Sequence, residues 1–489
     1  MTSVISAPDD ELPAGEVLAE EVVAGPEGIG RQLAILAVGS ALFMQFIDQT
    51  ALSTALPTLA AAFSIPPIDL KLVLTSYILV QAVIVPASGW AADRWGARRI
   101  FMAAMAVFLL GSVLCGLSRT LGELVLFRIL QGAGAAMIMP VGRIIVVGQS
   151  SREQLVKAMA LLTTPAMVGP IIGPPLTGLI LKFASWPWIF YINLPVGILG
   201  MIAVWKFVPR TRQPHPGRFD SIGFVLAAVA MSSTMGLAET LGFNLIPWTV
   251  QVAALVLAVA SIVMFVRHAR TTERPVLDLS LLRIRTFRAS CTAGTLLRIG
   301  IGATPFLMPL LLQIGMGWSP LQAGGLTISM AIGALISRPA ATPMMRLFGF
   351  RNVLFWTAAT VGFFTLAPGF FRSSTPVWIM FGILAVGGFV RATQFTASNA
   401  LAFAELDQSQ VTAASTLQAV ILQLSISMGI TLGSLALQLV RISSGGQALT
   451  PSQFTVPFCF LGALALLATP IYARLAKDTG ADMTGHRRR

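Results

Sequence analysis

Long apolar stretches dominate the chain and are separated by short breaks rich in charged residues, proline or glycine. An α-helix of about 20 apolar residues spans the hydrocarbon core of a bilayer. The apolar residues run continuously rather than in alternation, which disfavours a membrane β-barrel. The pattern therefore predicts an all-α polytopic membrane protein with fourteen spans. The predicted spans are residues 33–56, 72–92, 100–118, 122–147, 158–181, 188–208, 219–239, 246–266, 289–313, 320–345, 352–371, 376–400, 410–439 and 454–473.

The composition of the 489 residues agrees with this pattern. The chain is 55% hydrophobic and 11% charged, whereas a soluble domain is about 25% charged. So few charges exclude a large soluble enzyme, and so much hydrophobicity excludes a disordered chain. The net charge of +13 would suggest nucleic acid in a soluble protein. In a membrane protein, basic residues collect in cytoplasmic loops instead, so nucleic acid is not a predicted partner.

The distribution of basic residues predicts the orientation. With the N-terminus inside, 23 of the 33 Lys and Arg residues fall in inner segments, five in outer segments and five within spans. This bias places both termini in the cytoplasm. Residues 1–30 contain seven acidic residues and no Lys or Arg, so they read as an acidic disordered tail rather than a signal peptide.

The chain also divides into two comparable halves. The loop at residues 93–99 and the loop at residues 346–351 share a Gly-x-Arg element at the inner end of a helix. Two six-helix bundles around a midplane site are typical of alternating-access transporters. The predicted organisation is an acidic tail (1–30), an N-terminal six-helix bundle (31–212), two inserted helices (213–275), a C-terminal six-helix bundle (276–476) and a basic tail (477–489).

The most specific string is GWAADRWGARR at residues 89–99. Its glycines suit a close helix approach and a tight turn, and a carboxylate at the membrane edge needs a partner. The string fits a charge latch that closes the inner side in one conformation. It fits equally well a plain helix-to-helix turn with basic topology residues. The latch residues would be Gly89, Asp93, Arg94, Gly96, Arg98 and Arg99.

Five stretches together carry a family resemblance. Residues 89–99 resemble the loop signature of the major facilitator superfamily, residues 126–134 its fourth-helix motif and residues 165–175 its fifth-helix antiporter motif. Residues 46–57 and 186–197 resemble motifs of the fourteen-span drug:proton antiporter subfamily, from which Ser53 and Pro187 depart. The resemblance implies two six-helix bundles plus two extra helices, and export coupled to protons.

The fifth predicted span is unusually rich in small residues and proline. Such a helix bends and presents a bare face, so it packs closely and can rock. A hinge at the seam between the two halves is favoured over a generic packing face. The hinge residues would be Pro165, Gly169, Pro170, Gly173, Pro174 and Gly178.

One carboxylate lies deep within a span. Asp48 is 15 residues into the first span, about 22 Å along the helix, where an acid is a functional hypothesis by default. Arg128 of the fourth span lies at a similar depth, so the two side chains can interact. Asp48 and Arg128 are the predicted proton-coupling residues; the alternative is a static ion pair that holds two helices together.

Arginines outnumber acids inside the spans. Arg298 and Arg391 lie deep in the second half, where they favour neutral, zwitterionic or anionic amphiphiles over dications. For Arg298 the alternative is pairing with backbone carbonyls at a helix break. Residues that could line the substrate cavity are Gln45, Phe46, Gln49, Tyr77, Gln131, Arg298, Gln313, Arg391, Gln394 and Asn399.

The chain lacks a P-loop motif, a metal-binding cluster and a catalytic triad, so we expect neither an enzyme nor a cofactor or metal. The prediction is a proton-coupled exporter of hydrophobic or amphiphilic small molecules. Alternatives are a symporter or uniporter of an organic anion, and a non-transporting receptor or lipid-handling protein. Expected partners are substrate, protons and the lipid bilayer. We expect a monomer in a cell membrane, the bacterial inner membrane, and leave an accessory membrane-fusion protein open.

Overall fold

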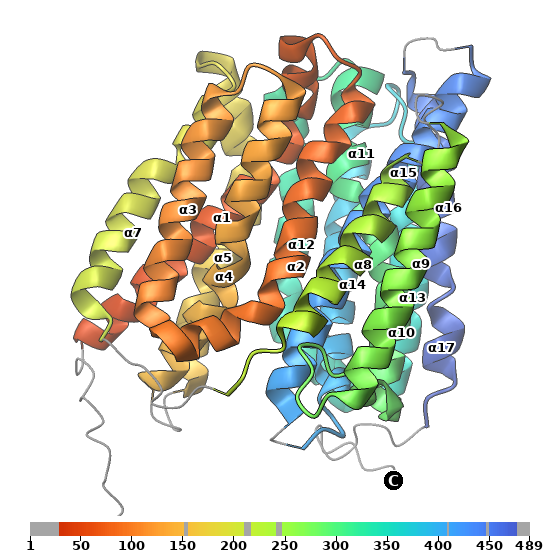
Figure 1. Cartoon of the computed structure of the whole chain (residues 1–489). Coiled ribbons are helices and arrows are strands. Elements are labelled where there is room, and N and C mark those ends of the chain that lie inside the picture. The colour runs from red at the N-terminus through yellow and green to blue at the C-terminus, as the bar shows by residue number, and fades with distance from the viewer. Residues whose placement is uncertain are drawn as a thin grey trace, which may run out of the picture.

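The computed structural model describes residues 29–150, 155–209, 217–240, 247–407, 410–445 and 449–476. Helices joined by turns and loops make up these parts, which contain no strand (Figure 1). The predicted tails lie outside them, apart from residues 29 and 30. The helices are α1 Ile29–Phe63, α2 Lys71–Trp95, α3 Ala97–Leu117, α4 Leu121–Gly148, α5 Leu155–Phe183, α6 Trp188–Tyr191, α7 Asn193–Phe207, α8 Ser221–Thr240, α9 Trp248–Thr271, α10 Arg285–Gly302, α11 Thr304–Leu310, α12 Pro320–Phe348, α13 Phe350–Leu366, α14 Val377–Ala402, α15 Val411–Ser443, α16 Thr455–Leu466 and α17 Thr469–Ala473. Short helical turns are η1 Pro67–Leu70, η2 Leu279–Arg283, η3 Leu311–Gly315, η4 Ala367–Phe370 and η6 Pro451–Phe454.

Within the described residues, thirteen helical segments are long and apolar enough to cross a membrane. The remaining predicted span coincides with α5, which is 29 residues long and contains a shorter apolar helix, Val168–Phe183. The all-α membrane fold is therefore confirmed. In Figure 1 the start of α1 and the end of α17 lie at the same end of the molecule. We call this the termini end and the opposite one the far end.

Several predicted spans are not single helices: 188–208 divides into α6 and α7, 454–473 into α16 and α17, and 289–313 has a marked break. Residues 289–313 were expected to be continuous, but α10 ends at Gly302, α11 starts at Thr304, and η3 adds a π-helical turn. Pro305 at the start of α11 has no N–H and its ring clashes with the preceding turn, which explains the break.

Two glycines turn the chain sharply between neighbouring helices. Gly96 ends α2 and begins α3 with φ of 92°, and Gly349 ends α12 and begins α13 with φ of 76°. A side chain would be strained at these angles. The tight turn predicted in the first loop is confirmed, and its counterpart in the second half has the same form.

The helices form two groups that contact each other along a few lines. Helices α1 to α7 pack on one another, as do α10 to α17. Contacts between the groups come chiefly from α5 with α12, α2 with α15 and α1 with α11. Helices α8 and α9 pack together, and α8 also contacts α2 and α15 (Figure 1). The domain boundaries at residues 212, 275 and 476 stay predictions, and residue 212 lies outside the described residues.

The hydrophobic cores differ between the two ends of the molecule. At the far end one cluster contains residues of both groups, including Leu56 of α1, Leu310 of α11 and Leu437 of α15. At the termini end, one cluster belongs to the first group, with Phe101 and Val141 among its members. A separate cluster there belongs to the second group. The two groups share one core at the far end, which is closed in this structure. A fourth cluster also joins them, through Ala82 of α2, residues of α8 and α9, and Leu417 of α15.

Glycines bring α5 against α12 at the far end. A Cβ atom at Gly178 would lie 2.5 Å from the Cα of Leu321, and one at Gly324 would lie 2.4 Å from the carbonyl oxygen of Pro174. No real Cβ tolerates such distances, so only glycine permits this approach.

We expect Gly178→Leu to push α5 away from α12 and to open the far end. A suitable reporter is a cysteine at Thr54, whose carbonyl oxygen accepts a 2.8 Å hydrogen bond from Gln313 Nε2 across the two groups. In a background without the native cysteines, its reaction rate with a water-soluble maleimide should rise several-fold. Gly382→Leu is the control, because nothing lies within 4 Å of its Cβ position. Equal rates in the two variants would contradict this account of the closure.

Helix α8 is tied to both groups near the far end. The Glu239 carboxylate receives Lys71 Nζ of α2 at 3.1 Å and Thr431 Oγ1 of α15 at 2.6 Å. Lys71 is buried, with a side chain only 1% exposed. The inserted pair of helices is thus linked to the first group by an ion pair and to the second group by a hydrogen bond.

At its other end α8 is held by Asp220. This carboxylate accepts hydrogen bonds from Gly223 N at 2.8 Å, His268 Nε2 at 2.7 Å and Val276 N at 3.1 Å. Burial acts to raise the pKa of Asp220, but these bonds outweigh it and lower the pKa below its ordinary value.

A lowered pKa makes this contribution to stability dependent on pH. It is present above the ordinary carboxyl pKa of about 3.9 and is lost as the pH falls through the lower value of the folded state. Asp220→Asn should therefore flatten the loss of thermal stability between about pH 5 and pH 3. Melting curves in detergent test this, with Asp278→Asn, at the start of η2, as the control. Parallel curves for wild type and Asp220→Asn would refute the assignment.

Candidate functional site

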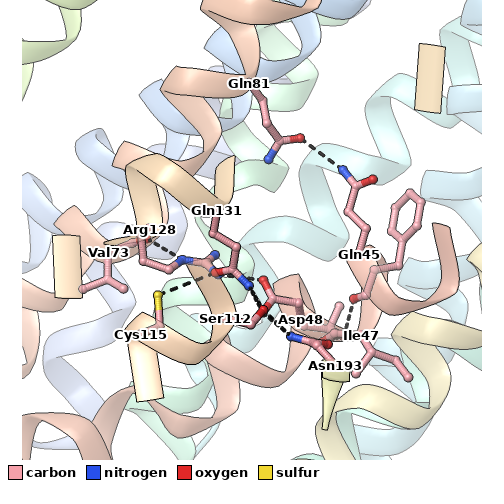
Figure 2. Close-up of polar contacts among 12 residues, drawn as sticks. Gln45, Ile47, Asp48, Val73, Gln81, Ser112, Cys115, Arg128, Gln131 and Asn193 are labelled. Atoms are coloured by element: carbon pink, nitrogen blue, oxygen red, sulfur yellow. Dashed lines mark hydrogen bonds and ion pairs between the residues drawn. The ribbon is translucent and has the colours of Figure 1, made fainter. Parts of the chain in front are cut away.

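Asp48 lies at the centre of a buried polar network in the first group of helices (Figure 2). Its side chain is 1% exposed, as is that of Arg128. Arg128 Nη1 donates to Asp48 Oδ2 at 2.6 Å, while Gln131 Nε2 and Asn193 Nδ2 donate to Asp48 Oδ1 at 2.9 and 3.0 Å. The carboxylate thus has three donors around it, the arrangement expected for its ionised form. The structure places the two predicted proton-coupling residues in direct contact.

Arg128 determines how the neighbouring amide is oriented. A guanidinium can only donate, so the oxygen of Gln131 must face it, and Arg128 Nη1 lies 2.6 Å from Gln131 Oε1. This leaves the amide nitrogen of Gln131 to donate to Asp48 and to Ser112 Oγ at 2.7 Å. Arg128 and Gln131 are three residues apart on α4, so one helix face carries both groups.

Arg128 is also held by the second helix. Its Nε donates to the carbonyl of Val73 at 3.4 Å, and its Cζ lies 3.9 Å from the centre of the Tyr77 ring. Tyr77 is 1% exposed, so the aromatic face covers the cation away from water. Helices α1, α2 and α4 therefore meet at this ion pair.

Two members of the network were not among the predicted site residues. Asn193, the first residue of α7, donates to Asp48 and also lies 3.3 Å from Ser112 Oγ of α3. Asn193 lies in the 186–197 motif and inside a predicted span. A polar amide at such a position could have marked it as a candidate site residue. Ser112 had none, because isolated serines are common in membrane helices.

The structure does not show the expected close approach at Gly89. Nothing lies within 4 Å of the Cβ position of this glycine, so the prediction that Gly89 lets two helices meet is wrong for this conformation. The far end, rather than the termini end, carries the glycine-mediated contact between the groups. In a state with the termini end closed, the same bare surface would be available for packing.

The charged residues of the same loop do not form a latch here. Asp93 has no ion pair with any residue that the structure describes. Arg94 and Arg99 are exposed, and Arg98 Nη2 donates to the carbonyl of Trp205 on α7.

The predicted hinge residues place α5 against two helices, α1 and α12. The Cβ positions of Gly169 and Gly173 would lie 2.8 Å from Phe46 Cβ and 2.1 Å from Thr50 Oγ1 of α1. Pro165 approaches Gly39 of the same helix. Pro174 and Gly178, one turn apart, contact α12 at Gly324 and Leu321 as described above. Pro170 is half-buried, and α5 continues through all four prolines without an interruption.

The predicted cavity residues fall into separate places. Gln131 and Tyr77 belong to the Asp48 network, and Phe46 and Gln49 are half-buried on α1. Gln45 Nε2 donates to Gln81 Oε1 at 3.3 Å, and Gln423 Nε2 of α15 donates to the same oxygen at 3.1 Å, so this chain of amides joins the two groups.

The remaining cavity residues lie away from Asp48. Gln313 is used in the far-end contact with Thr54. In the second group, Thr357 Oγ1 donates to Gln394 Oε1, and Gln418 Nε2 donates to Asn399 Oδ1 at 3.0 Å. In the same group Arg298 is buried, and Arg391 is half-buried with its Nε and Nη1 atoms buried.

Comparisons with known proteins agree with this architecture. The sequence profile described as Major Facilitator Superfamily matches residues 38–288, just over half of the chain. "Putative multidrug resistance protein MdtD" of Escherichia coli strain SE11 is 38% identical over 475 residues, covering 95% of this chain and 98% of the relative. The protein of the same name from strain K12 / DH10B is 39% identical over 476 residues, with the same coverage.

Solved structures share the fold at low sequence identity. A POT family transporter in complex with 5-aminolevulinic acid is 14% identical with a TM-score of 0.69, covering 92% of this chain and 98% of that structure. The peptide transporter POT in complex with sulfate is 13% identical with a TM-score of 0.67, covering 95% and 98%. The helical architecture, the multiple membrane spans and the matched sequence together define a multi-pass membrane transporter, not an enzyme. The chain belongs to the major facilitator superfamily.

Proposed function

We propose that the protein is a proton-coupled antiporter that exports hydrophobic or amphiphilic small molecules by alternating access. The observation that carries this proposal is the buried Asp48 carboxylate with its three donors. A charged carboxylate inside a membrane span costs free energy, so its presence there indicates a function. The names of the relatives, which refer to multidrug resistance, support a broad set of drug-like substrates.

The mechanism follows from two features of the structure. Asp48 is paired with Arg128, and the two groups share a core at the far end. With both termini in the cytoplasm, as the basic residues predict, this is a state closed to the outside after proton release. A proton arriving from outside in the alternate state would neutralise Asp48. Arg128 would then lose its ionic partner while keeping the acceptors Gln131 Oε1 and the Val73 carbonyl, and the weaker link between α1 and α4 would favour return of the site to the inside.

Other predicted residues have roles that fit this cycle. The amides of Gln45, Gln81 and Gln423 link α1 to α15 of the second group. A movement of α1 on protonation of Asp48 would therefore be transmitted to the second group across the interface. The latch around Asp93 would close the termini end when the far end opens, and α5 would be the hinge. We propose a functional monomer in the bacterial inner membrane, working with or without a membrane-fusion protein.

Transport by the reconstituted protein tests this proposal. Purified protein in liposomes with an imposed pH gradient should accumulate a fluorescent amphiphile, and nigericin, which collapses the gradient, should stop the accumulation. Addition of substrate should in turn dissipate a preset gradient, read with a pH-sensitive dye. Flux that is the same with and without a gradient would identify a uniporter and refute proton coupling.

A further inference from the structure

Two arginines inside the second group have no acidic partner among the residues that the structure describes. Arg298 of α10 is 8% exposed, and its Nη1 has no hydrogen-bond partner. Arg391 of α14 is half-buried, and its buried Nε and Nη1 atoms have no partner among the described residues. Its Nη2 donates to Thr365 Oγ1 at 3.4 Å. All three unpartnered atoms are donors, so what the site lacks is an acceptor.

The second half of the chain cannot supply that acceptor from its own acids. Residues 279–477 contain eleven arginines but only two acidic residues, Glu405 and Asp407. Both are exposed beyond the end of α14. By contrast, the buried arginine of the first group has Asp48 at 2.6 Å. A charge that is removed from water without a partner costs several kcal/mol. The presence of such an arginine in both α10 and α14 therefore calls for a function.

Lipid headgroups are too far away to neutralise these cations. Arg298 lies 13 residues from the start of α10, about 20 Å along the helix. Arg391 lies 11 residues before the end of α14, about 16 Å from it. Both are near the middle of a bilayer whose hydrocarbon core is about 30 Å thick. Pairing of Arg298 with backbone carbonyls, the alternative raised by the sequence, is not found within the part of the chain that the structure describes.

The guanidinium of Arg298 packs against a glycine and lies near one aromatic ring. A Cβ at Gly294, one turn earlier on α10, would lie 3.2 Å from Arg298 Nη1, so the guanidinium rests on bare backbone. Its Cζ lies 5.9 Å from the ring centre of Phe395, which is 46% exposed. Phe395 follows Arg391 by four residues, so both lie on one face of α14. An apolar ring therefore stands beside the two cations.

We propose that Arg298 and Arg391 bind the anionic group of the transported molecule, a carboxylate, sulfonate or phosphate on an amphiphile whose apolar part packs against Phe395. This rests on the proposed export function and assigns its substrate class. Proton and substrate would then have separate sites, Asp48 in the first group and the arginines in the second. Two unpaired guanidiniums would repel a dicationic drug.

Equilibrium binding tests the assignment without any gradient. The probes share one body and differ in the head: octylbenzoate, octylbenzamide and octylbenzylammonium. Protein in phosphatidylcholine nanodiscs should bind the benzoate at least about tenfold more tightly than the amide, since one charge-assisted hydrogen bond has this effect. Arg298→Gln should weaken benzoate binding about 10- to 100-fold and leave amide binding unchanged, while Arg298→Lys should keep part of the preference.

Arg338→Gln is the matched control, because Arg338 is exposed on α12 and its loss removes the same charge. Equal binding of benzoate and amide by wild type, or equal losses in Arg298→Gln and Arg338→Gln, would overturn the assignment. If Arg298→Gln binds no probe, Arg391→Gln is judged by the same two criteria. Phosphatidylglycerol discs should leave benzoate affinity unchanged; displacement by that lipid would assign the site to a headgroup and overturn the proposal. Failure of proton coupling would leave these affinities untouched, so the two proposals fail separately.

Discussion

Replacing Asp48 with Asn should abolish the proton movement that accompanies transport. The amide is similar in size to the carboxylate and can still accept from Arg128, so helix packing at the network should survive. It cannot take up or release a proton at physiological pH. In liposomes with a preset pH gradient, substrate added to the variant should no longer dissipate the gradient, whereas substrate binding should persist.

Glu123→Gln is the matched control for this experiment. Glu123 is an exposed acid in the first turn of α4, where its carboxylate accepts from the backbone N of Arg119 at 2.7 Å. Its replacement removes one negative charge from the same group of helices and should leave coupling intact. Proton movement of wild-type size in Asp48→Asn would leave the Asp48–Arg128 pair as a static link between α1 and α4.

Replacing Arg128 with Met should strongly destabilise the fold. The substitution removes the positive partner, the hydrogen bond to Val73 and the contact with Tyr77, and it leaves Asp48 buried without a counter-ion. Breaking a buried pair on one side costs about 3–5 kcal/mol. Thermal unfolding of the purified variant in detergent should therefore begin at a much lower temperature than unfolding of the wild type.

A double-mutant cycle separates the charge effect from the loss of packing. The double variant Asp48→Asn with Arg128→Met has no buried charge at this place, so it should recover much of the lost stability. Arg119→Met, at an exposed position just before α4, is the control and should melt like the wild type. Additive effects of the two single substitutions would mean that the ion pair has no energetic coupling.

Hydropathy alone predicts the helices of this protein closely. The predicted span 122–147 is observed as Leu121–Gly148, and 376–400 as Val377–Ala402. The observed helices are slightly longer because they extend past the hydrocarbon, where polar residues are tolerated. The break between α10 and α11 was not anticipated, because the residues around Pro305 and Pro309 remain apolar and a hydropathy window does not register backbone geometry.

The site is only partly predictable from the sequence. Asp48 and Arg128 stand out because charged residues are rare within spans, and the sequence alone shows this rarity. Asn193 and Ser112 could not be assigned to Asp48 in the same way, since they come from α7 and α3 and the contact depends on how four helices meet. The prediction for Gly89 failed because helices approach closely at this glycine only when the termini end is closed. In this structure the far end is the closed one.

Infrared difference spectroscopy offers the most direct measurement of whether Asp48 is the proton carrier. Spectra of the purified protein recorded at acid and alkaline pH should contain the C=O stretching band of a protonated carboxylic acid that becomes ionised. Subtraction of the same spectra for Asp48→Asn should isolate one carboxyl group, and Glu123→Gln should retain that group in full. Identical difference spectra for wild type and Asp48→Asn would show that the buried carboxylate does not titrate, and would contradict its role in proton coupling.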